Sequence, residues 1–214
     1  GATEFVGYDN NESKSKVIAI VKDGESVSSI QRSSVAKQEE FYIILDKTPF
    51  YGESGGQVGD YGFFHKEGGG TIQINNTRKP LDDFIVHEAV FTVGDVLSVG
   101  DTVKAVITED ARNATRANHS ATHLMHKALR DVLGEHVTQK GSLVDATRLR
   151  FDFSNNKAVS REEISEVERR VNEVIARGGA VECKEMSPDE AIEAGAMALF
   201  GEKYGDKVRV LGIG

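Results

Sequence analysis

The sequence predicts an α+β protein with two domains: a small antiparallel β-barrel over residues 1–107 and an α+β domain over residues 108–214. Two observations carry this prediction. Short runs rich in β-branched and aromatic residues, separated by turn residues, fill the first half. After residue 107 the hydrophobic period changes from two towards 3.6, which is typical of helices.

Within the first half, the predicted strands are short and evenly spaced, as in a small barrel. Glycine and asparagine pairs between them suit turns that need a positive φ. The expected strands cover residues 17–21, 41–45, 71–74, 85–91 and 102–107.

The second half begins with a long predicted helix between Thr108, a plausible N-cap, and Gly134, a natural stop. Two capping-box patterns predict two further helices, the first starting at Ser160 and the second, with proline at its first position, at Ser187. Strands are expected at residues 149–153, 181–183 and 208–211.

Composition narrows the class of protein. A hydrophobic fraction of 39% can bury a core, and one cysteine excludes an internal disulfide framework. No apolar run approaches the length of a membrane helix, so no membrane partner is expected, and the cytoplasm is the default location. A net charge of −8 argues against a surface wholly devoted to nucleic acid, although a local basic face is compatible with it.

The long predicted helix carries histidines on one face. His119 and His123 are one turn apart, so both imidazoles can reach one metal ion, and His126 and Arg130 continue the same face. Ser120 stands where a zinc peptidase of the H-E-x-x-H type has its glutamate, which argues against that class. By spacing alone, a half-buried helix face explains the pattern equally well.

Two imidazoles are too few for a catalytic zinc ion, which normally takes three protein ligands. No spacing rule selects the third ligand. The internal candidates are His87, His126, His136 and Cys183.

A glycine-rich segment at residues 52–60 lacks the lysine of a phosphate-binding P-loop. Its chemistry alone favours a tight barrel turn with polar groups at the surface. The residues of this segment that are candidates for substrate binding are Gly55, Gly56, Gln57 and Asp60.

Taken together, residues 48–60, 118–124, 139–142 and 196–204 resemble the editing domain of bacterial alanyl-tRNA synthetases, in order and in spacing. The resemblance covers essentially the whole chain. It implies a translation-factor-like β-barrel, followed by the α+β domain shared with threonyl-tRNA synthetase and with freestanding editing proteins.

The resemblance further implies hydrolysis of tRNA(Ala) that is wrongly charged with serine or glycine. A small pocket rejects an added hydroxyl by only about 10²-fold, so a second site is needed. His119 and His123 match two zinc ligands of the family, and Gln139 matches a glutamine implicated in editing. Thr48 matches a threonine thought to sense the seryl hydroxyl. The implied partners are mischarged tRNA(Ala) and the remainder of a synthetase in the same polypeptide.

In the family, two more zinc ligands lie in a Cys-Gly-Gly-Thr-His motif that is expected after Gly214. The sequence therefore reads as a fragment in which zinc is bound weakly or not at all, and which is an incomplete catalytic unit as isolated. Two other classes stay open: a tRNA-binding module without catalysis, and a metal-dependent esterase unrelated to tRNA.

Overall fold

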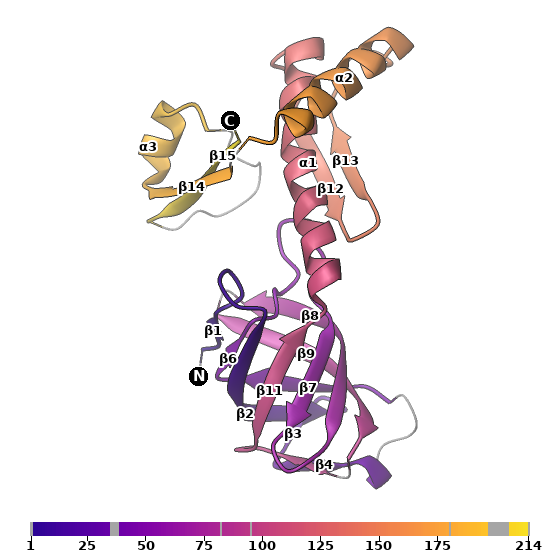
Figure 1. Cartoon of the computed structure of the whole chain (residues 1–214), viewed down its shortest axis with the longest axis vertical. Coiled ribbons are helices and arrows are strands. Elements are labelled where there is room, and N and C mark those ends of the chain that lie inside the picture. Colours follow the sequence, from indigo (N-terminus) through magenta and orange to yellow (C-terminus); the bar gives the residue numbers. More distant parts are fainter. Residues whose placement is uncertain are drawn as a thin grey trace. The chain divides into compact units, whose positions relative to one another are not determined.

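The computed structural model describes residues 2–34, 39–81, 83–94, 96–179, 181–196 and 206–213, and Figure 1 shows the order of the elements. The chain splits into two compact units. Unit 1 comprises Gly1–Arg116 and Asp145–Thr147, and unit 2 comprises Ala117–Val144 and Arg148–Gly214. The division lies inside helix α1 (Glu109–Leu133), later than the boundary predicted after residue 107.

Unit 1 contains a closed antiparallel barrel of six strands, which confirms the barrel predicted from the first half of the sequence. The strands follow the order β11-β7-β8-β9-β5-β2, and β11 pairs with β2 to close the ring. They are β2 (Glu12–Lys22), β5 (Phe41–Leu45), β7 (Gly62–Lys66), β8 (Thr71–Leu81), β9 (Phe84–Val93) and β11 (Thr102–Ile107).

Shorter elements surround the barrel. Strand β3 (Glu25–Val27) pairs with β2, β4 (Ser29–Gln31) pairs with β10 (Val96–Ser98), and β1 (Glu4–Phe5) pairs in parallel with β6 (Lys47–Thr48); a 3-10 helix covers Arg32–Ser34. Each of the five predicted strands lies within an observed barrel strand. Strand β7 is missing from the predicted set; it begins at a glycine, a residue that is depleted in strands.

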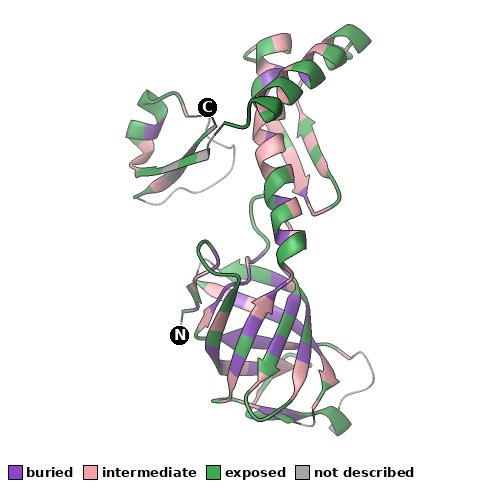
Figure 2. Cartoon of the chain, in the orientation of Figure 1, coloured by how far each residue is buried: buried purple, intermediate pink, exposed green. Residues whose placement is uncertain are grey.

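The barrel core is built from the inward-facing side chains of alternate strand positions. In Figure 2, buried and exposed residues alternate along the barrel strands. Phe50 contributes from the loop after β6, and its ring meets Phe64 edge to face with the centroids 5.3 Å apart. The buried core comprises Val17, Ile20, Ile30, Phe41, Ile43, Leu45, Phe50, Phe64, Ile72, Ile74, Ala89, Leu97, Val103, Ala105 and Ile107.

Unit 2 is built on α1, helix α2 (Arg161–Arg177) and a hairpin of β12 (Gln139–Val144) and β13 (Leu149–Phe153). Ala128 and Leu129 of α1, Val137 and Val167 form its buried cluster. The predicted start of α2 is confirmed, since the Ser160 hydroxyl accepts from the Glu163 N–H at 3.1 Å and the Glu163 carboxylate accepts from the Ser160 N–H at 2.8 Å.

The remaining elements are an antiparallel pair, β14 (Val181–Met186) and β15 (Val208–Ile213), and helix α3 (Pro188–Glu193). Helix α3 begins with the predicted capping box of Ser187 and Glu190. The matching segment at residues 196–204 lies outside the described residues, apart from Ala196. Among the helices of the described residues, none has the length and apolar character that crossing a membrane requires.

Candidate functional site

The predicted histidine face exists on α1. His119 and His123 are both half-buried, and their rings stack with centroids 5.0 Å apart and planes at 20°. Burial, followed by the charge of His123, lowers the pKa of His119. A neutral imidazole keeps a nitrogen lone pair for a metal ion or a hydrogen bond, so His119 suits a ligand role at neutral pH.

His126 lies one turn further along α1 and is 5% exposed. Neither of its ring nitrogens has a hydrogen-bond partner among the described residues, and the ring packs against Phe151 with centroids 4.9 Å apart. Burial lowers its pKa, and the nearby charges of Arg130 and His123 act in the same direction. His126 is therefore a neutral group enclosed between α1 and the β12–β13 hairpin.

The described residues hold no group of three or more His, Cys, Asp or Glu side chains that could bind a metal ion together. Of the candidates for a third ligand, His87 is fully buried with both ring nitrogens hydrogen-bonded, and His136 bonds to Asn155 at 2.8 Å. The Cys183 side chain lies outside the described part. His119 and His123 thus fit two positions of a zinc site, fewer than the three that catalytic zinc normally takes from the protein.

Gln139 is the first residue of β12 and is half-buried. It lies opposite Phe153 of β13, and the strand register shifts by one residue between Gln139 and Gly141. No hydrogen bond joins its side chain to another described residue. The amide of Gln139 is therefore available for a ligand within unit 2.

The glycine-rich segment is a tight turn, as its chemistry predicts. Gly55 and Gly56 have φ values of 58° and 83°, and the backbones of Ser54 and Gln57 on either side bond to each other at 2.9 and 3.2 Å. Two consecutive residues with positive φ make the two-residue hairpin that glycine supports best. A Cβ on Gly59 would lie 1.9 Å from the Thr77 carbonyl oxygen, so close packing against β8 requires glycine there.

Asp60 is buried in unit 1, paired with Arg112 from the first turns of α1. The Arg112 Nε donates to the two Asp60 carboxylate oxygens at 3.0 and 2.9 Å, and its other nitrogens donate at 2.8 Å to the carbonyls of Gly7 and Pro49. The Tyr51 N–H also donates to Asp60, at 2.7 Å. The prediction that the polar groups of this turn lie at the surface is wrong for Gln57 and Asp60, because both are buried. Both are engaged within the protein, and this geometry favours a structural role for them.

Thr48 is fully buried beside His87 of β9. The His87 Nδ1–H donates to the Ile43 carbonyl at 2.9 Å, so its Nε2 accepts from the Thr48 hydroxyl at 2.8 Å. The Thr48 oxygen in turn accepts from the Phe50 N–H at 3.2 Å. Thr48 thus uses its one donor hydrogen and one of its two lone pairs inside the barrel, and its complete burial keeps it from contacting a substrate in this conformation.

Arg112 holds the Asp60 carboxylate in place, and His87 holds the Thr48 hydroxyl. The sequence predicted this role for neither residue. Arg112 is 52 residues from Asp60, and His87 is 39 from Thr48. The sequence contains one indication of this role. Both residues stand at positions where the helical or strand period predicts a side chain on the buried face.

The match to known proteins defines the class of this protein. Residues 1–111 match the model of the class II tRNA synthetases (A), which is half of the chain, and the chain belongs to this family. The curated relatives to which the chain is similar are of one kind within this family, the alanine-tRNA ligases. The chain is 49% identical to the alanine-tRNA ligase of Mesorhizobium japonicum and 50% identical to that of Parvibaculum lavamentivorans, in both cases over all 214 residues.

The alanine-tRNA ligase of Sphingopyxis alaskensis is 49% identical over the same 214 residues. The resemblance to bacterial alanyl-tRNA synthetases is thereby confirmed. The chain spans 23–24% of the length of these relatives.

Proposed function

We propose that this chain supplies the hydrolytic editing site of an alanyl-tRNA synthetase, which cleaves the ester between serine or glycine and tRNA(Ala). The observation that carries the proposal is the pair of stacked, half-buried imidazoles of His119 and His123 in the same unit as Gln139. Near-50% identity to alanine-tRNA ligases makes a misacylated tRNA(Ala) the substrate that fits.

In the proposed site, Gln139 orients the aminoacyl ester or the attacking water by hydrogen bonds. Its amide has two donor hydrogens and an acceptor oxygen but no titratable group, so it cannot act as a general base. A zinc ion held by His119 and His123 would polarise the ester carbonyl or lower the pKa of a bound water. Thr48 receives no substrate contact in this proposal, because its hydroxyl is already bonded inside the barrel.

The first prediction concerns Gln139. In a full-length alanine-tRNA ligase with this chain as its corresponding region, Gln139→His should lower serine release from seryl-tRNA(Ala) at least about tenfold, or about 1.4 kcal/mol in activation free energy. Gln73→His is the matched control, because Gln73 is an exposed glutamine of β8. Charging of tRNA(Ala) with alanine should stay unchanged in both variants.

Undiminished serine release by Gln139→His would remove Gln139 from the mechanism. A second candidate function, a tRNA-binding module without catalysis, predicts instead that the wild-type protein binds seryl-tRNA(Ala) and releases no serine at any zinc concentration. Cleavage of small activated esters, with indifference to tRNA, would point to an unrelated esterase.

The second prediction concerns zinc. The 214-residue chain, prepared in metal-free buffer, should contain clearly less than one zinc ion per molecule, because two imidazoles do not complete a tetrahedral site. Elemental analysis measures the content, and His119→Ala/His123→Ala is the baseline. Stoichiometric zinc that persists when the other four histidines and Cys183 are replaced would contradict this prediction.

A further inference from the structure

Strand β12 contains an irregularity in its pairing with β13, between Gln139 and Gly141. In a regular strand successive side chains alternate between the two faces of the sheet. An extra residue in one strand therefore changes which of its residues share a face.

The pairing with β13 locates this irregularity at Lys140. Gln139 pairs with Phe153, whereas Gly141 pairs with Asp152 and Ser142 with Phe151, so Lys140 is an extra residue in the ladder, a β-bulge. Cross-strand partners share a face of the sheet. Gln139 and Ser142 therefore lie on the same face of the hairpin although they are three residues apart.

That shared face is the one packed against α1. Phe151 lies 4.9 Å from His126, ring to ring, and Phe151 and Phe153 both pack against the buried cluster of unit 2. On the opposite face, Arg150 and Asp152 are exposed and paired at 3.2 Å. The bulge thus places two polar side chains, Gln139 and Ser142, among the aromatic residues that face the histidine helix.

Ser142 is half-buried, and its hydroxyl makes no hydrogen bond with another described residue. The hydroxyl of Thr138, one residue before the strand, is instead bonded to Ser154 at 2.8 Å. A serine hydroxyl can donate one hydrogen bond and accept two. Ser142 therefore offers an unused hydroxyl on the surface that also presents the amide of Gln139.

We propose that Ser142 is a second substrate-binding residue of the site, and that its hydroxyl contacts the aminoacyl ester end of the tRNA beside Gln139. The proposal rests on the proposed function. Since the residues of β12 would alternate in a regular strand, Ser142 faces the site only because of the bulge at Lys140.

The first experiment tests the geometry without relying on activity. Cys183, the chain's one cysteine, is replaced by alanine, and single cysteines are introduced at positions 138, 139, 140 and 142. A maleimide should label positions 139 and 142 more slowly than positions 138 and 140. Labelling at 142 that is as fast as at 140, with 139 still slow, would indicate a regular strand and overturn the proposal.

The second experiment measures deacylation of seryl-tRNA(Ala) by the full-length ligase. Ser142→Ala should lower kcat/KM about 3- to 10-fold, the effect of one hydrogen bond, and Ser142→Thr should restore most of it. Thr138→Val, which removes a hydroxyl from the other face, should have no effect.

The outcomes separate the two proposals. If Gln139→His lowers deacylation and Ser142→Ala does not, the Ser142 contact is wrong and the proposed function stands. If the wild-type ligase releases serine and neither substitution lowers the rate, the roles of Gln139 and Ser142 are both wrong. If the wild-type ligase releases no serine, the proposed function fails, and the Ser142 contact fails with it. An equal loss in Ser142→Thr and Ser142→Ala would show that packing, and not the hydroxyl, is what the site needs, and would also overturn the contact.

Discussion

Replacing Arg112 with alanine is expected to destabilise unit 1 by about 3–5 kcal/mol, the cost of leaving a buried charge without its partner. The side chains of Arg112 and Asp60 are 7% and 9% exposed, so water cannot solvate the carboxylate that remains. The substitution also removes the donors to the carbonyls of Gly7 and Pro49. Urea unfolding followed by circular dichroism measures the change.

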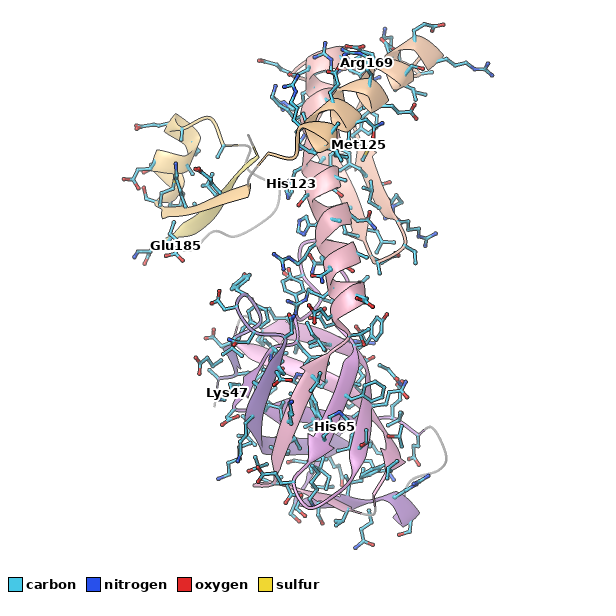
Figure 3. The ribbon with its side chains drawn as sticks, in the orientation of Figure 1. Lys47, His65, His123, Met125, Arg169 and Glu185 are labelled. Carbon is cyan, nitrogen blue, oxygen red and sulfur yellow. The ribbon has the colours of Figure 1, made fainter. Side chains whose placement is uncertain are left out.

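Arg169→Ala is the matched control. Arg169, labelled in Figure 3, lies on α2 and is about half exposed, with ion pairs to Glu166 and Glu173. Exposed pairs contribute about 0–1 kcal/mol, so this arginine should be dispensable for stability. A loss of less than about 1 kcal/mol for Arg112→Ala would show that the buried pair does not hold the start of α1 to the glycine-rich segment.

The double variant Asp60→Asn/Arg112→Met provides a further check. Because both charges are removed together, it should cost less than the sum of the two single substitutions. Full additivity would mean that the two side chains act independently, contrary to the contacts at 3.0 and 2.9 Å.

Periodicity and caps predicted the local structure correctly. The helical period of α1 predicted that His119 and His123 share a face, and the serine capping boxes predicted where α2 and α3 start. Such signals act within about one turn or a few residues, so one sequence is enough to detect them.

Features that depend on distant partners could not be predicted in this way. The bulge at Lys140 is defined by its pairing with β13, and it removes the alternation that would have marked β12 as a strand. In the sequence, Thr48 before the glycine-rich segment and Asp60 at its end look like accessible polar residues. Their partners, His87 and Arg112, come from β9 and α1, and only the folded barrel brings them together.

His87 should make the barrel sensitive to acid. Complete burial lowers its pKa from 6.5 to about 4, in spite of its hydrogen bond to the Ile43 carbonyl. At a pH between about 4 and 6.5, His87 binds a proton in the unfolded chain but not in the folded barrel. The stabilisation from a neutral His87 is thus complete above about pH 6.5 and declines as the pH falls towards 4.

Between pH 7 and pH 4.5 this difference corresponds to a loss of about 2.5 kcal/mol, at about 1.4 kcal/mol for each pKa unit. His119 and His126 also have lowered pKa values and add to the loss over the same range, so the comparison must isolate His87. The free energy of unfolding of His87→Gln should be lower at pH 7 but should vary less with pH than that of the wild type.

His65→Gln is the control, because it removes an exposed histidine of β7 from the same barrel. NMR titration of the imidazole gives a direct measurement that does not require the His87 variant to fold. Titration of His87 near pH 6.5 in the folded protein would contradict its burial as a neutral ring. Titration near pH 4 would agree with a neutral ring whose unprotonated Nε2 accepts from the Thr48 hydroxyl.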